Sequence, residues 1–352
     1  MLNRKEWFSL AAAVAASVAA GVLSHAHANA VAAFVVSGVA LALLARLVGD
    51  ATEQLGGRLS AGATGVLQSA LGNLPELFVG IFSLRAGLVG VVQAALVGSI
   101  LANSLLVLGL AFLVGGLKNG TQRFSSEPPR MIAALMLLAV SALVVPTLAH
   151  TLRTPADVHG DSLSVACAAV LLLVFLLSIP VSLKGDSPSC PPGHTPEASG
   201  WPLWLAIALL TGAGVGAAFV SDWFVDALTP AIRTLGLSQA FTGLVVVAIA
   251  GNAVENVVGI QLAARNQMDY AVSVILNSSL QVALGLGPVL VLLSLVLGGA
   301  HLTLVLPPLL VVALALASLV SAFVVYDGES IWLEGVALIG LYAIIAAAFW
   351  WG

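Results

Sequence analysis

Apolar residues fill most of the chain in long blocks, which are separated by short polar stretches. A helix needs about 20 apolar residues to cross the hydrocarbon core of a bilayer. At that length the pattern predicts eleven spanning helices, and period-2 strands typical of an outer-membrane barrel are absent. The expected fold class is an all-α polytopic membrane protein. The predicted spans are residues 6–24, 30–57, 62–86, 88–116, 128–150, 161–183, 201–228, 237–265, 267–298, 302–326 and 329–351.

The polar stretch 185–200 is predicted to be a linker, because four prolines and three glycines in its sixteen residues exclude a regular helix. It separates a first unit, residues 29–184, from a second unit, residues 201–352, and residues 1–28 form an extra N-terminal span. Each unit holds five predicted spans. An odd number of spans makes the second unit enter the membrane from the opposite face, so we expect inverted repeats.

Composition and charge support a membrane protein. Hydrophobic residues make up 60% of the chain and charged residues 8%, and the mean hydropathy is +1.09, whereas soluble domains carry about 25% charged residues. Basic residues favour a cytoplasmic N-terminus by the positive-inside rule, and we expect a bacterial inner membrane. Eight then lie inside (Arg4, Lys5, Arg58, Lys118, Arg123, Arg130, Lys184, Arg265) and three outside (Arg85, Arg153, Arg233). Residues 1–28 also resemble a signal peptide, but we favour their retention.

Two short phrases recur in the two units. Gly72-Asn73-Leu74-Pro75-Glu76 is followed 179 positions later (251 minus 72) by Gly251-Asn252-Ala253-Val254-Glu255. The same offset relates residues 98–101 to residues 277–280. The repetition indicates that one supersecondary unit occurs twice.

Each phrase places one glutamate inside an apolar span, at a cost of about 3 kcal/mol on insertion scales. A single such carboxyl could be protonated or hydrogen-bonded, and could serve only to hold neighbouring helices together. A matched pair, Glu76 and Glu255, favours an ion or proton pathway. Gly72, Pro75 and Gly251 weaken the helices beside them, and interrupted helices in transporters line a midplane site.

Several uncharged oxygen-bearing side chains accompany the glutamates: Asn73, Asn252, Ser99, Asn103, Ser278, Ser279 and Gln281. Their alternative role is hydrogen bonding between helices. Together with the glutamates they form a set of hard oxygen donors, which suits Ca²⁺ and disfavours zinc or copper. Because one Ca²⁺ or two protons neutralise two carboxylates equally well, the pair indicates exchange of one cation for the other.

A second acidic set consists of Asp50 and Glu53, late in one predicted span, and Asp222 and Asp226, late in another. These four, the access-path acids, either conduct cations or protons to the site or are solvated charges at helix ends. The sequence leaves both interpretations open.

The paired phrases and the serine-rich stretches after them resemble the calcium/proton exchanger (CAX) family of the cation/calcium exchanger superfamily. The resemblance covers residues 40–352 and implies that Glu76 and Glu255 bind Ca²⁺ and H⁺ alternately. The helpers that it implies are Asn73, Asn252, Ser99, Ser278 and Gln281. The chain departs from the family pattern at Asn256, where His is usual, and at Asn277, where Gly is usual.

The sequence therefore predicts a Ca²⁺/H⁺ antiporter rather than an enzyme. The alternative is a Na⁺/Ca²⁺ or monovalent cation/proton exchanger. A passive channel rarely needs a titratable pair, and an intramembrane hydrolase would need a Gly-x-Gly-Asp phrase or zinc-ligand spacing, which the chain lacks. We expect no cofactor besides the transported Ca²⁺ and H⁺, the lipid bilayer as partner and no nucleic acid. A homo-oligomer stays open.

Overall fold

The computed structural model describes residues 3–26, 29–56, 71–184 and 200–350, which are almost entirely helical. The first half contains α1 (Arg4–His25), α2 (Ala30–Gly56), α4 (Leu74–Arg85), α5 (Val89–Leu101), η1 (Ala102–Val107), α6 (Leu108–Asn119), β1 (Gln122–Arg123), α7 (Glu127–Thr151), η2 (Pro155–His159) and α8 (Gly160–Lys184). The second half contains α9 (Leu203–Leu235), α10 (Gln239–Phe241), η3 (Thr242–Val247), α11 (Ala248–Gly251), α12 (Ala253–Ala264), α13 (Met268–Gln281), η4 (Val282–Leu286), α14 (Gly287–Ser294), α15 (Pro308–Val324), β2 (Glu329–Ser330) and α16 (Trp332–Trp350).

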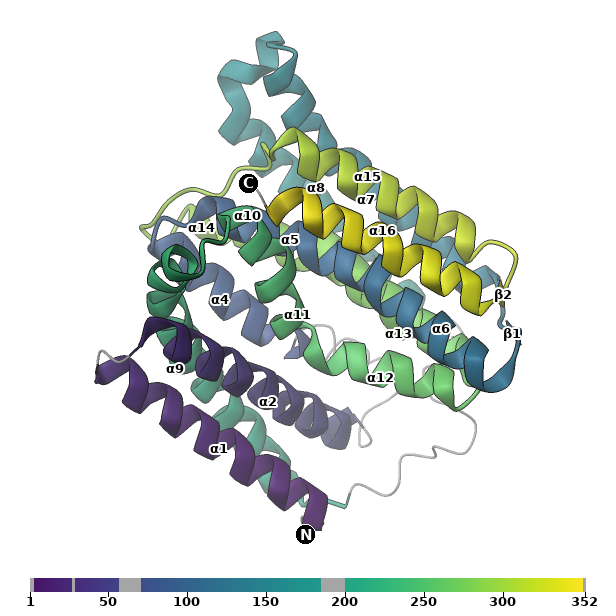
Figure 1. Cartoon of the computed structure of the whole chain (residues 1–352). Helices are drawn as coiled ribbons and strands as arrows, with labels where there is room; N and C mark the ends of the chain where they lie inside the picture. The colour runs from purple at the N-terminus through teal and green to yellow at the C-terminus, as the bar shows by residue number, and fades with distance from the viewer. Residues whose placement is uncertain (1–2, 27–28, 57–70, 185–199, 351–352) are drawn as a thin grey trace.

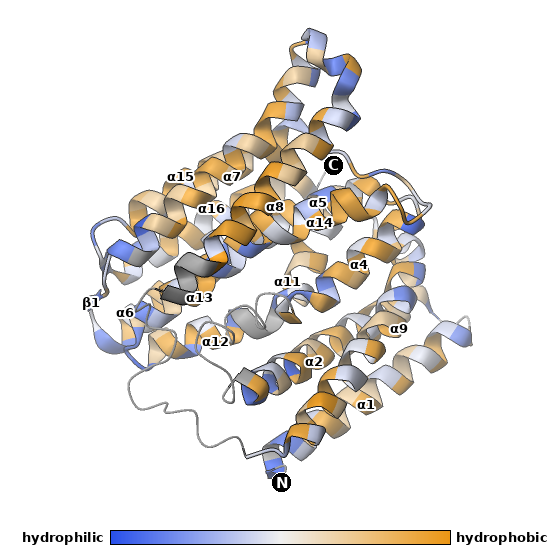
Figure 2. Ribbon diagram, turned by 180° about the vertical axis from the view of Figure 1, so that it is seen from behind, coloured by the Kyte–Doolittle hydropathy of each residue, from blue (hydrophilic) through white to orange (hydrophobic). Residues whose placement is uncertain are grey.

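The predicted fold class is confirmed. Among the described residues, eight helices are long and apolar enough to cross a membrane, and a bent pair, Gln239–Gly251 with Asn256–Ala264, makes up to nine. Figure 2 shows apolar residues along the lengths of the helices and polar residues concentrated near helix ends and connections. Helix α15 is apolar but shorter. The predicted span 62–86 lies partly outside the described residues, as does most of the predicted linker, so the count of eleven stays a prediction.

The described helices pack around two large hydrophobic cores, and a small third cluster contains Ala51, Trp201 and Ala206. The first core joins α1, α2 and α9, and includes the stacked rings of Phe34 and Phe224, whose centroids are 4.7 Å apart. The second core joins α5 to α8 with α13 to α16. Figure 1 shows the α1, α2 and α9 group at one end of the molecule and α7, α8, α15 and α16 at the other. Helices α4 and α12 lie between these groups, which puts the two glutamate-bearing helices at the junction.

Three π-helical segments occur within longer helices. Segment η1 continues α5 into α6, and η4 continues α13 into α14, so each forms one long helix. These two segments begin at nearly equivalent positions of the repeat, Ala102 and Val282. A third, η3, lies between α10 and α11. π-helical turns are rare in proteins overall but are often found at functional sites. Their placement beside the serine-rich stretches therefore favours a functional role for these stretches.

The predicted span 302–326 begins too early. Residues 301–307 are not helical, and α15 starts at Pro308, because a proline suits the first turn of a helix but cannot continue one. Leu302, Leu304 and Leu306 of this segment are buried, and side chains from other helices satisfy polar groups of its backbone. Gln93 Nε2 donates to the carbonyl oxygens of Thr303 and Val305 at 2.9 and 3.0 Å, and the Leu304 amide donates to Ser164 Oγ at 3.0 Å. Such contacts allow irregular backbone at membrane depth.

Candidate functional site

The helices are interrupted where the two Gly-Asn phrases predicted it. Asn73 directly precedes α4 and Asn252 directly precedes α12, with φ/ψ of −91°/13° and −93°/17°. Both conformations lie in the sparsely populated bridge region, where many active-site residues are found. The two pieces of the second broken helix are bent by 62°. Equivalent residues of the repeat therefore adopt the same local geometry.

Neither asparagine caps its own helix with its side chain. An asparagine at a helix N-cap usually accepts a hydrogen bond from that helix. Here the Asn252 amide donates to Glu76 of α4 and to the Ala248 carbonyl of α11, and the Asn73 amide donates to Gln281 of α13.

The Glu76 carboxylate receives two hydrogen bonds at Oε1. Asn252 Nδ2 donates at 2.6 Å, and Ser99 Oγ donates at 3.2 Å. Gly251 allows this approach, because a Cβ there would lie 2.7 Å from Glu76 Oε1. Glu76 also lies in the first turn of α4, where the positive end of the helix dipole favours a negative charge. The first half's glutamate is thus held by the second half's asparagine.

The hydrogen-bond network continues into the protein from Asn252. Asn103 Nδ2 donates to Asn252 Oδ1 at 3.1 Å and to Ser278 Oγ at 2.9 Å. Asn103 and Asn252 are fully buried. Buried polar groups are expensive unless they are paired, so a network of this depth fixes the position of each member.

The remaining predicted helpers also form hydrogen bonds between helices. Asn73 Nδ2 donates to Gln281 Oε1 at 3.3 Å. Ser279 Oγ lies 3.1 Å from Ser104 Oγ, which joins α13 to η1. Ser104 was not among the predicted site residues. Ser104 lies 175 positions before Ser279 (279 minus 104), which is close to the repeat offset.

The position of Glu255 is known only through its backbone. It lies in the first turn of α12, where the Asn256 amide donates to the Asn252 carbonyl at 3.0 Å. Its side chain lies outside the described residues. The meeting of the two glutamates therefore stays a prediction.

The access-path acids are distributed over two distant places. Helices α2 and α9 run antiparallel, because Phe34 contacts Phe224 near one end while Ala51 packs with Ala206 near the other. Asp50 and Glu53 consequently lie at one end of this helix pair, and Asp222 and Asp226 lie toward the opposite end. Asp50 is 4.0 Å from Arg46, and the other three are exposed.

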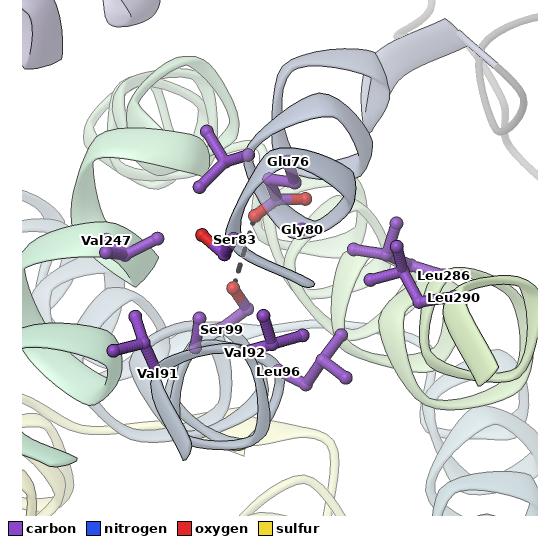
Figure 3. A pocket seen from close by; sticks show the side chains of 12 residues that line it. Glu76, Gly80, Ser83, Val91, Val92, Leu96, Ser99, Val247, Leu286 and Leu290 are labelled. Carbon is purple, nitrogen blue, oxygen red and sulfur yellow. Dashed lines mark hydrogen bonds between the residues drawn. The ribbon is translucent and has the colours of Figure 1, made fainter. Parts of the chain in front are cut away.

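A small cavity of about 30 Å³ adjoins Glu76 (Figure 3). Val79, Val91 and Val247 on its wall belong to the core around α2 and α9. Val92 and Leu290 belong to the other core. The cavity therefore lies on the seam between the two packed bodies, beside a carboxylate bound from both halves. Such a placement suits a site that opens when one body moves against the other.

Comparison with known protein families identifies the kind of protein that carries this site. Residues 29–184 and 205–351 match the model of the sodium/calcium exchanger protein family. The chain belongs to this family. Together with the apolar helices, this membership makes the chain an integral membrane transporter rather than an enzyme.

Characterised relatives are similar over nearly their whole length. The Ca²⁺/H⁺ antiporter of Synechocystis sp. is 36% identical over 336 residues, and the alignment covers 90% of both chains. That of Aphanothece halophytica is 34% identical and covers 92% of this chain and 91% of the relative. The Ca²⁺/H⁺ antiporter ChaA of Bacillus subtilis is 32% identical over 99% of both chains.

Solved structures agree on the architecture. Native YfkE matches with a TM-score of 0.83 and 30% identity, over 97% of this chain and 99% of YfkE. An H⁺/Ca²⁺ exchanger, CAX, matches with a TM-score of 0.79 over 98% of this chain and 92% of that chain; at 19% identity it shows the fold alone. The sodium-calcium exchanger NCX_Mj is less similar, with a TM-score of 0.58 over 90% of this chain and 97% of that chain.

Proposed function

We propose that this protein exchanges Ca²⁺ for H⁺ across a membrane by alternating access. The observation that carries the proposal is the Glu76 carboxylate, which lies on the seam between two cores and is hydrogen-bonded by Asn252 from the other half. Relatives that bear the name Ca²⁺/H⁺ antiporter, at 32–36% identity over at least 90% of the chain, support the choice of ions.

In this proposal Glu76 and Glu255 bind Ca²⁺ and protons in turn. The amide and hydroxyl hydrogens on Glu76 Oε1 stabilise the ionised carboxylate, and an arriving cation competes with them for the same oxygen. Ser99, Asn103, Ser278 and Gln281 supply further oxygens. Two carboxylates with neutral oxygen donors match the preference of Ca²⁺ for six to eight hard ligands.

We infer that the site is formed by two inverted repeats, residues 29–184 and 201–352, with residues 1–28 as an extra helix. The separate family matches to residues 29–184 and 205–351 support this division. The matching geometry at Asn73 and Asn252 supports it independently. With eleven spans, the basic residues favour a cytoplasmic N-terminus in a bacterial inner membrane.

Reconstituted transport tests this function. The purified full chain in proteoliposomes should accumulate Ca²⁺ when a pH gradient is imposed, and Ca²⁺ entry should dissipate that gradient. A Na⁺ gradient alone should drive no Ca²⁺ flux. Na⁺-driven flux without proton movement would instead establish the Na⁺/Ca²⁺ alternative, which the lower similarity to NCX_Mj disfavours.

A further inference from the structure

The cavity beside Glu76 contains a hydroxyl that the site does not use. Ser83 belongs to the cavity wall and is 1% exposed. It lies seven residues after Glu76 on α4, which places it on the same helix face and about 10 Å nearer the helix's C-terminal end. Figure 3 shows the Ser83 side chain beside the hydrogen bond that joins Glu76 and Ser99, with its oxygen turned toward the side of Val247.

The Ser83 hydroxyl has no hydrogen-bond partner among the described residues. A buried hydroxyl in an apolar wall is unfavourable unless a water or an ion meets it. Besides Ser83, Glu76 and Ser99, the described wall of this cavity is apolar. A cavity of about 30 Å³ has room for one or two waters. That space is too small for a hydrated Ca²⁺ ion.

Two contacts close the cavity toward the end of α4. Helix α5 and segment η3 touch through their backbones there, because a Cβ on Gly243 would lie 2.5 Å from the Val91 carbonyl oxygen. The Ala300 amide also donates to the Leu84 carbonyl at 3.2 Å, next to Ser83. Arg85, two residues after Ser83, is exposed. Ser83 therefore lies between the glutamate and the molecular face that carries Arg85, hereafter the Arg85 face.

The other half lacks an equivalent hydroxyl. The repeat offset relates Glu76 to Glu255 and Gly80 to Gly259, but it relates Ser83 to Leu262. A property that depends on Ser83 can therefore act on one face of the membrane only.

We propose that Ser83 is a positioning residue of the access path from the Arg85 face. When the α5–η3 crossing separates, the cavity becomes the inner end of this path, and the Ser83 hydroxyl replaces part of the cation's water before the cation reaches Glu76. This role rests on the proposed exchange function. It assigns Ser83 an effect on cation entry from the Arg85 face and none on entry from the opposite face.

Sided transport measurements test the role. In everted and right-side-out vesicles, Ser83→Ala should raise the KM for Ca²⁺ on the Arg85 face by about threefold or more, because one hydrogen-bonding group is lost. The KM on the opposite face should stay at its wild-type value. Ser83→Thr keeps the hydroxyl and should behave as wild type, while Ser83→Leu introduces the residue of the other half and should slow entry most. An unchanged KM in Ser83→Ala, or equal changes on both faces, would overturn the proposal.

A second experiment does not depend on the transported ion. In a Cys167→Ser/Cys190→Ser background, Ser83→Cys should react with a small membrane-impermeant thiol reagent added to the Arg85 face and should resist it from the opposite face. Labelling from the opposite face, or none in a variant that still transports, contradicts the assigned path. Sided labelling in a protein that moves no Ca²⁺ would reject the exchange function while supporting the path.

Discussion

The two halves of this chain carry the same residue at some equivalent positions and different residues at others. The shared residues include the two glutamates proposed to bind the ion, whereas residues that differ can make transport unequal on the two faces of the membrane. Glu76 and Glu255 match, as do the asparagines before them and their bridge-region backbone. By contrast Ser83 corresponds to Leu262, and Gly98 corresponds to Asn277. Unmatched residues also occur within the network, because Asn103 corresponds to Val282 and Gln281 corresponds to Ala102.

The largest effect is expected where the halves match. Glu76→Gln and Glu255→Gln should each abolish Ca²⁺/H⁺ exchange, because each removes one of the two charges that neutralise Ca²⁺. Both proteins should still fold and insert, since glutamine has the same shape. Ca²⁺ uptake in proteoliposomes measures this, with Asp327→Asn, in the loop before β2, as a near-neutral control. Full transport by either glutamine variant would show that the matched pair is not the ion site.

A glycine that occurs in one half only should tolerate substitution poorly. Gly98→Asn introduces the residue of the second half where helix α5 touches Leu244, and should prevent that contact at a cost of about 1–3 kcal/mol. Asn277→Gly makes the opposite exchange. Asn277 is half-buried and bonds to Ser273 at 3.3 Å within its own helix, so its loss should matter little. Thermal unfolding and transport rates compare the two variants. An equal loss of stability or of transport in both would contradict this prediction, because it would mean that Gly98 and Asn277 matter equally.

The two asparagines should differ although their backbones match. Asn252→Ala removes a 2.6 Å hydrogen bond to the Glu76 carboxylate and should lower the transport rate about tenfold or more, since bonds to charged groups contribute about 1.5–3 kcal/mol. Asn73→Ala removes a bond to the neutral Gln281 and should have the smaller effect. Ca²⁺ uptake kinetics measure both, and a larger loss in Asn73→Ala would reverse the assignment of the tighter contact.

A smaller effect is expected at the bend in the second half. Gly251→Ala would place a methyl group 2.6 Å from Glu76 Cγ, so the carboxylate must shift and the apparent Ca²⁺ affinity should fall severalfold. Gly214→Ala, in α9, adds the same methyl group where nothing lies within 4 Å. It should leave both affinity and stability at wild-type values. Should Gly251→Ala keep its affinity, Glu76 would have more freedom than its hydrogen bonds indicate.

The sequence predicted the fold class, the interruptions at both Gly-Asn phrases and most helix positions, because apolar length and helix-breaking residues act locally. Four residues that it placed beside the glutamates, Asn252, Ser99, Asn103 and Ser278, lie in one hydrogen-bond network with Glu76, and their role in binding the ion stays a prediction. It could not predict that Asn252 holds Glu76 while Asn73 holds Gln281, since that choice depends on how the halves pack.

Other features depend on distant contacts. The non-helical segment 301–307 is stabilised by hydrogen bonds from Gln93 and Ser164 on two other helices, and no local pattern shows that they reach it. The π-helical segments arise within uninterrupted apolar stretches. The sequence does not distinguish Ser83, because serine inside a helix commonly bonds to its own backbone, and only the folded structure places it on the cavity wall.

The central claim is that one carboxylate from each half binds the same ion. Equilibrium Ca²⁺ binding to the purified protein, to Glu76→Gln, to Glu255→Gln and to the double variant tests it most directly. If the site is shared, either single substitution removes the bound Ca²⁺ as completely as the double one does. If each single variant still binds a Ca²⁺ ion with wild-type affinity and only the double variant loses it, the halves carry separate sites and the account is wrong.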